Sequence, residues 1–515
     1  YNSAVGYQAS KENTSGYYNT NFGYEAGRDN QTGSGNVNVG YQAGMVGANT
    51  TGGNVHVGFR AGKNRTSRWG VFVGWAAGEN ATSGDNQVGV GFSALNDCTT
   101  GTNNTALGSN SLAKLTTNSD NTAVGFATMQ AATTAISSVA VGSQALGSHV
   151  TTQNNTAVGY RSMWSATSGS ENTAVGTNSL AQTTGTNNTG VGYYVLLNNT
   201  TGYQNTAIGS VSLDANTTGY QNTGVGYNSL SANNTGFHNT GIGSAALASN
   251  TTGQDNTAVG KSALLATTTG SYNTAVGRSA LHANTASYNN AFGYFALYQN
   301  TTGTLNVAVG AEALDANTTG SYNTVVGMRA LTTNTTGEYN TALGYEALRN
   351  STSADSNTAV GYYAARATTS GVLNVAVGQN CLMSNTGGNS NTAVGQGAMQ
   401  TNTTGHDNTA LGKSSMALNT TGRYNVAVGR QSLNSNTEAD NNTAVGYHCL
   451  YSNTTGTSNV AVGTEALDAN TTGGSNVAVG KQALDANTTG VGNVAVGANA
   501  LGANTTAGSN TAIGN

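Results

Sequence analysis

The chain has 515 residues, no proline, only 7% charged residues and a formal net charge of −4. Its lysines and arginines are scattered, so no basic stripe indicates a nucleic-acid partner. No apolar run approaches the roughly 18 residues that a membrane-spanning helix needs, so we expect no membrane contact within this segment.

A five-residue motif, typified by Asn-Thr-Ala-Val-Gly at 256–260, recurs along the whole chain. Its glycine occurs first at Gly6 and last at Gly514, which are 508 residues apart over 30 intervals, so the mean period is just under 17 residues. All but four intervals are 17 residues, and the exceptions are one of 18 and three of 16. A strict period this short is typical of stacked repeats that contact only their neighbours. We number the unit N-T-A-V-G-Y-x-A-L-x-x-N-T-T-G-x-x from position 1 to position 17.

The repeat predicts one continuous solenoid over 1–515, with variant repeats in 1–85 and regular repeats in 86–515. Both ends are in repeat phase and neither carries an atypical capping unit. Solenoids need such units to protect their strand edges, so we expect the sequence to be an excerpt of a longer protein or a unit that stacks end to end.

The motif predicts a short strand followed by a turn. Position 4 is consistently apolar, position 2 is Thr, Val or Ser, and both lie on one face if side chains alternate with period 2. We expect position 4 to be the most buried, to meet a leucine at position 9 of a second short strand, and position 3 to face outward. Glycines at positions 5 and 15 are expected to supply the reversals through positive φ. The fold class predicted is all-β: a parallel β-solenoid (β-roll) of about 30 rungs, one per repeat.

An outward row of small residues at position 3 favours close approach of another chain. On that argument we expect a homotrimeric rod, with a monomeric solenoid as the alternative. The alanines expected at the interface are Ala123, Ala157, Ala174, Ala207, Ala258, Ala275, Ala308 and Ala359.

The pattern NTAVGxxAL…NTTGxxN resembles the head repeats of YadA-like trimeric autotransporter adhesins, whose signature is S-V-A-I-G. It also resembles NTAVGYxAL arrays in tail-fibre-like proteins that end in an endosialidase-type chaperone domain. The resemblance covers the whole chain and implies a trimeric parallel β-roll used as a surface fibre or adhesin. The adhesin repeat is shorter, however, and no neck, stalk, anchor or chaperone segment is present in this sequence.

The first five repeats carry a small residue at position 9 and an aromatic residue at position 6. One interpretation is that the ring fills the volume that the missing leucine leaves. The other is an exposed aromatic ladder that stacks on sugars. The residues concerned are Tyr7, Tyr24, Tyr41, Phe59 and Trp75. Asn21 and Asn38 at position 3 predict either an asparagine ladder or polar layers that hold water or an ion.

The Asn-Thr-Thr segment at positions 12–14 also has two interpretations. It fits the N-glycosylation pattern, and it fits a stack of side chains that bond from rung to rung; we favour the stack. The candidate glycan acceptors are Asn49, Asn199, Asn216, Asn250, Asn300, Asn317, Asn334, Asn402, Asn419, Asn453, Asn470, Asn487 and Asn504.

Residue types that carry catalysis or bind metals do not converge in this sequence. The six histidines lie several rungs apart, and no nucleophile or carboxylate motif is present, so we expect no enzyme activity, no metal and no cofactor. Cys381 and Cys449 at position 8 are expected to be small buried residues, and Cys98 at position 12 an exposed loop thiol.

The sequence therefore favours a non-enzymatic extracellular structural fibre or adhesin shaft that associates with itself. The alternative is a receptor- or glycan-binding tail fibre of a phage, whose partners are surface glycans or a host receptor. A weaker third hypothesis is an ice-binding solenoid, because threonine arrays on flat solenoid faces can bind ice.

Overall fold

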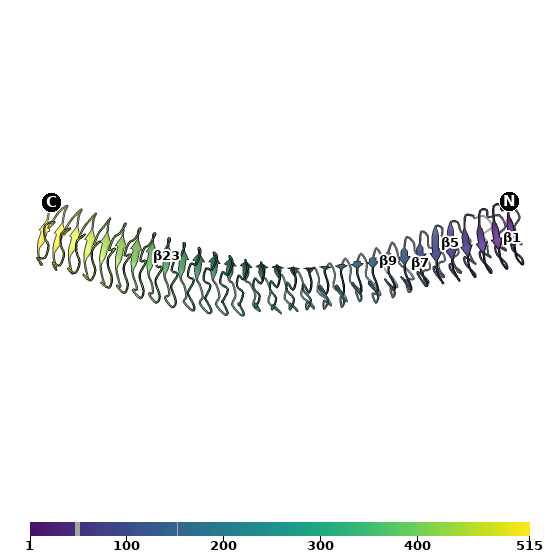
Figure 1. The fold of residues 1–515 in the computed structure, drawn as a ribbon, viewed down its shortest axis with the longest axis horizontal. Coiled ribbons are helices and arrows are strands. Elements are labelled where there is room, and N and C mark those ends of the chain that lie inside the picture. Colours follow the sequence, from purple (N-terminus) through teal and green to yellow (C-terminus); the bar gives the residue numbers. More distant parts are fainter. Residues whose placement is uncertain (47–51, 152) are drawn as a thin grey trace. The chain divides into compact units, whose positions relative to one another are not determined.

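The computed structural model describes residues 1–46, 52–151 and 153–515, in two compact units, Tyr1–Asp255 and Asn256–Asn515. In each unit, short strands follow one another in sequence order, one per repeat (Figure 1). The described part of the first unit contains β1 (Ser3–Val5), β2 (Thr20–Phe22), β3 (Val37–Val39), β4 (Val55–Val57), β5 (Gly70–Val73), β6 (Gln87–Val90), β7 (Thr105–Leu107), β8 (Thr122–Val124), β9 (Val139–Val141), β10 (Thr156–Val158), β11 (Thr173–Val175), β12 (Thr189–Val191), β13 (Thr206–Ile208), β14 (Thr223–Val225) and β15 (Thr240–Ile242).

The second unit contains β16 (Thr257–Val259), β17 (Thr274–Val276), β18 (Asn290–Phe292), β19 (Val307–Val309), β20 (Thr324–Val326), β21 (Thr341–Leu343), β22 (Thr358–Val360), β23 (Val375–Val377), β24 (Thr392–Val394), β25 (Thr409–Leu411), β26 (Val426–Val428), β27 (Thr443–Val445), β28 (Val460–Val462), β29 (Val477–Val479), β30 (Val494–Val496) and β31 (Thr511–Ile513). Neighbouring strands pair in parallel with equivalent positions opposite each other, as Ala258 does with Ala275. The predicted fold, a parallel β-solenoid of about 30 rungs with about 17 residues each, is confirmed.

The predicted orientation of the strand is wrong. Position 3 points into the coil and is fully buried, as at Ala258, whereas position 4 points outward, and Leu107 is 47% exposed. Positions 1, 8, 9 and 12 share the interior with position 3. In a typical rung the buried set is therefore an asparagine at position 1, two small residues, a leucine or methionine at position 9, and a position-12 residue that is most often a second asparagine.

This orientation also corrects the expected trimer interface. All eight alanines assigned to it are fully buried within their own coil, so their small size reflects limited room inside a rung. They are Ala123, Ala157, Ala174, Ala207, Ala258, Ala275, Ala308 and Ala359. They are not accessible to a second chain.

The expected second strand is also absent from the described rungs, because the segment after the position-5 glycine is a series of turns. In the rung of β16, Ser262 at position 7 and Leu264 at position 9 have φ of 56° and 50°. Leu264 is nevertheless fully buried, as predicted for position 9. The left-handed backbone at these positions turns the leucine side chain inward without a second strand.

The two glycines of the repeat have different structural roles. At position 5, φ lies between 128° and 145°, which other residues rarely adopt. At position 15, Gly303 is not in that region, but a Cβ there would lie 2.2 Å from the carbonyl oxygen of Gly320 in the next rung. Positive φ therefore explains position 5, and the close approach of the next backbone explains position 15.

Substituting a position-5 glycine tests this packing. In Gly344→Ala, the new Cβ would meet the carbonyl oxygen of Gly361 at 2.4 Å, at a φ of 135°. We expect the free energy of unfolding of the second unit to fall by about 2 kcal/mol or more, measured by urea denaturation. The control is Gly387→Ala, where the nearest atom, Oγ of Ser370, is 3.6 Å away. Equal effects of the two variants would contradict the account.

Candidate functional surfaces

Two files of asparagine side chains bond from rung to rung inside the coil. At position 1, the Nδ2 of Asn306 donates to the Oδ1 of Asn289 at 3.2 Å and to the carbonyl of Gly320 at 2.9 Å. At position 12, the Nδ2 of Asn317 donates to the Oδ1 of Asn300 at 2.7 Å and to the same carbonyl of Gly320 at 2.9 Å. The two amide ladders thus meet at the position-15 carbonyl in the rungs that carry asparagine at both positions, which are most of the rungs from Asn188 onward.

This geometry decides between the two interpretations of the Asn-Thr-Thr segment. Most of the candidate glycan acceptors are fully buried with both amide protons in use, so a glycan on them is incompatible with the folded coil. The fully buried ones are Asn199, Asn216, Asn250, Asn300, Asn317, Asn334, Asn402, Asn419, Asn453, Asn470 and Asn487. Asn504 is half-buried and still donates to Asn487, and Asn49 lies outside the described residues. The rung-to-rung stack is what the structure contains.

In four of the five variant repeats, a larger residue at position 3 compensates for the glycine at position 9. A Cβ on Gly27 would meet the Asn21 side chain at 2.6 Å, and one on Gly78 would meet the Phe72 ring at 2.4 Å. Volume compensation is therefore real, but its partner is position 3 inside the coil and not the aromatic residue at position 6. Asn38 donates to the Oδ1 of Asn21 at 2.7 Å, which confirms an asparagine ladder at position 3 here.

A buried polar cluster interrupts the asparagine ladders near β5. Arg65 occupies position 12, fills the space left by Gly70 at position 1, and donates to Gln87 Oε1 at 3.2 Å and to Arg68 O at 3.0 Å. Burial lowers the pKa of Arg65 to about 10. The Sγ of Cys98 accepts a hydrogen bond from Gln87 Nε2 at 3.1 Å. Cys98 is fully buried, so its prediction as an exposed loop thiol is wrong.

The other two cysteines behave as predicted for position 8. Cys381 and Cys449 are fully buried and unpaired, and burial raises the pKa of each thiol to about 12. Both thiols donate to a position-3 carbonyl one rung on, at 3.1 and 3.0 Å. We therefore assign them no redox role.

The position-6 rings of the first six rungs form one continuous ladder on the outer surface. Successive rings stack with centroids 4.8 to 5.5 Å apart and interplanar angles of 2° to 17°, in the order Tyr7, Tyr24, Tyr41, Phe59, Trp75 and Phe92. These rings lie outside the coil, so they do not fill the volume at position 9. Because each ring stacks on its neighbours, much of its face is used within the chain. Sugar binding by Tyr7, Tyr24, Tyr41, Phe59 and Trp75 stays a prediction.

The outward face of each unit's sheet carries positions 2 and 4, and we call it the T/V face. Position 2 is Thr or Val in most rungs, and position 4 is Val, Ile, Leu or Phe in every described strand. No charged residue occurs at either position. Position-4 side chains are partly to well exposed, for example 41% at Ile208 and 48% at Leu411. Each unit therefore presents an apolar file beside a file that is mostly threonine and valine.

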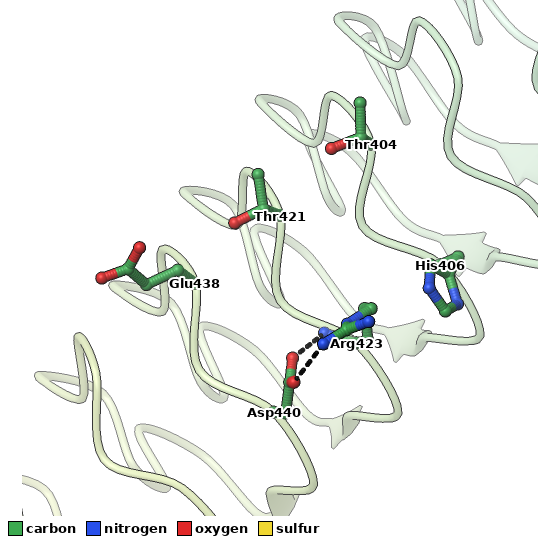
Figure 2. A pocket seen from close by; sticks show the side chains of 6 residues that line it. All are labelled: Thr404, His406, Thr421, Arg423, Glu438 and Asp440. Carbon is green, nitrogen blue, oxygen red and sulfur yellow. Dashed lines mark hydrogen bonds and ion pairs between the residues drawn. The ribbon is translucent and has the colours of Figure 1, made fainter.

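A shallow pocket in the second unit lies between two outward files of side chains (Figure 2). Thr404, Thr421 and Glu438 form the position-14 file, and His406, Arg423 and Asp440 the position-16 file. Arg423 donates to Asp440 at 3.0 Å through its guanidinium and at 2.7 Å through its backbone NH. The cation is thus already paired with a carboxylate, and the pocket has no buried polar group that points to a ligand.

The described residues include no group of three or more His, Cys, Asp or Glu side chains placed to hold a metal ion. They also include no helix long and apolar enough to cross a bilayer. No known family model matches the chain, and no curated protein sequence matches it either.

Two histidines are buried inside the first unit. His149 replaces the position-12 asparagine, is fully buried, and has no hydrogen-bond partner on either ring nitrogen among the described residues. Burial lowers its pKa to about 3. Burial, followed by the charge of Arg65, lowers the pKa of His56 to about 3 as well. Both rings are therefore neutral in the folded chain well below the ordinary histidine pKa of about 6.5.

These histidines predict acid sensitivity of the first unit. An unfolded histidine binds a proton below about pH 6.5 and the folded one does not, so stability is full above that pH and falls as the pH drops toward 3. Leucine already occupies position 12 at Leu115, so His149→Leu should be compatible with the coil. Between pH 7 and pH 4 we expect the free energy of unfolding of the parent to fall by up to about 3 kcal/mol more than that of His149→Leu. Tryptophan fluorescence reports this unit alone, since all three tryptophans lie in it. The control is His238→Leu, at an exposed histidine. If the unfolding free energies of His149→Leu, His238→Leu and the parent all depend on pH in the same way, buried His149 is not the cause of the acid sensitivity.

Proposed function

We propose that the chain is a non-enzymatic structural solenoid that associates with further copies of itself through the T/V face. The observation that carries this proposal is the outward position-4 file, which is apolar in every described strand. Monomeric proteins rarely expose a continuous apolar patch of more than a few hundred Å². A second T/V face would cover the file and leave no charge buried.

The proposed surroundings are extracellular, as part of a fibre or adhesin shaft. Support comes from the resemblance of the NTAVG repeat to adhesin heads and tail-fibre arrays. The repeat architecture supports a structural role too, because stacked rungs present one surface many times over. The three-fold symmetry expected from the sequence is no longer supported by particular residues, because the position-3 alanines assigned to its interface lie inside the coil.

Glycan binding is the second candidate function. The specific observation in its favour is the surface ladder from Tyr7 to Phe92, with Tyr7 62% exposed at its first ring. Retention of the chain on immobilised polysaccharides, compared with a variant in which Tyr7 and Tyr24 are serine, tests this candidate. Equal retention of both proteins would remove it.

The self-association proposal predicts a mass well above that of one chain. We expect sedimentation equilibrium to give a whole multiple of 51.6 kDa. Val309→Lys with Val326→Lys places two charges on the T/V face and is expected to shift the mass toward 51.6 kDa without unfolding, because both side chains point outward.

The matched control is Thr319→Lys with Thr336→Lys, which adds the same charge at exposed position 14 and should leave the mass unchanged. A parent chain of 51.6 kDa throughout the micromolar range would refute the proposal.

A further inference from the structure

Position 6 alternates between aromatic and small hydroxyl residues over ten consecutive rungs, from β6 to β15. In chain order they are Phe92, Ser109, Phe126, Ser143, Tyr160, Thr177, Tyr193, Ser210, Tyr227 and Ser244. The five rings are 46% to 62% exposed. Position 6 follows position 4 across the glycine, so this row of side chains borders the T/V face.

The alternation leaves a slot at every second rung. Rings two rungs apart are about 9.6 Å apart along the stack, with a serine or threonine between them. The chain itself shows what fits there, since in the first six rungs a ring occupies each such place and stacks on its neighbours at 4.8 to 5.5 Å. Each of the four slots between two rings, at Ser109, Ser143, Thr177 and Ser210, thus has the width of one aromatic side chain. Within the chain, Arg161 lies over the Tyr160 ring at 5.1 Å and the Tyr194 ring packs against Tyr193 at 4.0 Å, so these side chains must move aside when a partner ring enters.

We propose that these slots receive the rings of a second copy of this chain, in an antiparallel dimer across the T/V face. A two-fold axis along the strand direction, between the rungs of Tyr160 and Thr177, brings the two T/V faces together with position 6 opposite position 6. It pairs the sixth rung with the fifteenth, the seventh with the fourteenth, and so on. The facing pairs are then Phe92 with Ser244, Ser109 with Tyr227, Phe126 with Ser210, Ser143 with Tyr193, and Tyr160 with Thr177.

Four of the five rings of each copy enter a slot between two rings of the other in this arrangement, and the fifth, Phe92, meets Ser244 beside Tyr227. The ten-rung pattern begins with a ring and ends with a hydroxyl residue, so it is its own complement under a two-fold axis. A two-fold or three-fold axis parallel to the stack would instead place like rungs at one level, so no ring of one copy would lie level with a hydroxyl residue of the other. Interdigitation of this kind is how paired β-sheets exclude water between them.

The area involved is sufficient for a stable dimer. An aromatic side chain presents about 200 Å² when fully exposed, so ten half-exposed rings contribute on the order of 1,000 Å². The bordering position-4 side chains, such as Leu107, Ile208 and Ile242, are 40% to 47% exposed and add to that area. The sum reaches the roughly 1,200 Å² at which specific interfaces begin.

This inference rests on the proposed self-association and adds its direction and register. A cross-linking experiment separates the two. One preparation of the full chain carries Ser143→Cys, a second carries Tyr193→Cys, and the two have tags of different length. The native cysteines do not compete, because all three are buried.

We expect a disulfide between the two variants when they are mixed and oxidised, and little cross-linking of either alone. Residue 143 of one copy faces residue 193 of the other, whereas the two residues 143 are three rungs, about 14 Å, apart, which is too far for a disulfide. Cross-linking of each variant with itself would show parallel packing and overturn the inference while leaving self-association intact.

A slot-filling variant provides an independent readout. Ser143→Tyr with Ser210→Tyr occupies two slots within the chain, which the ladder of the first rungs shows to be compatible with the fold. We expect a Kd for self-association at least tenfold higher, and no change for the control Thr464→Tyr at position 6 of the second unit. An unchanged Kd would overturn the inference. A monomeric parent chain would overturn it too, and if variants with serine in place of the rings then lost retention on a polysaccharide, the slots would be assigned to a glycan.

Discussion

The asparagine amide ladders determine which side of the strand faces the coil interior. An asparagine at position 1 has its side chain inside, where its Nδ2 can reach both the neighbouring asparagine and the position-15 carbonyl. Because side chains alternate along a strand, position 3 must then also face inward and positions 2 and 4 outward. An unsatisfied buried amide costs about 1–3 kcal/mol, and the ladders remove that cost for the asparagines that they pair. Hydrogen bonding thus overrides the tendency of valine to be buried.

The sequence was sufficient to predict the repeat, the parallel stack and the inward leucine, because the 17-residue period and the position-5 glycine depend on local backbone requirements. It led to the wrong strand face because Val259 is more apolar than Ala258, and hydropathy alone would bury the larger residue. The prediction did not take into account that two asparagines eleven positions apart in the repeat share one acceptor, as Asn306 and Asn317 do at the carbonyl of Gly320. The recurrence of this spacing in most rungs from Asn188 onward was the available signal.

The sequence pattern also gave no indication that the position-9 leucine adopts a left-handed backbone conformation. A non-glycine residue in that conformation costs on the order of 1 kcal/mol, whereas burying a leucine gains about 1.5–3 kcal/mol. The balance favours a turn that inserts Leu264 into the coil over a second strand. In the variant repeats, where Gly27 and its equivalents take position 9, that cost disappears, and a larger position-3 residue fills the space.

The functional surfaces follow from the same constraint. Once polar asparagines occupy the interior, the apolar β-branched residues form the outer face of the sheet, where they are available to another chain. The alternation from Phe92 to Ser244 was visible in the sequence, but its significance depends on knowing that position 6 lies outside the coil beside position 4. Candidate residues assigned on the opposite orientation, such as Ala258 at an interface and Asn317 as a glycan acceptor, are instead parts of the core.

The most direct test of this account is side-chain amide exchange. In a chain labelled with ¹⁵N only at asparagine, the NδH₂ protons at positions 1 and 12 should persist for hours after transfer to D₂O, because they are buried and hydrogen-bonded between rungs. Their loss within minutes, at the rate of exposed asparagines such as Asn187, would contradict the claim that amide ladders form the core of the coil.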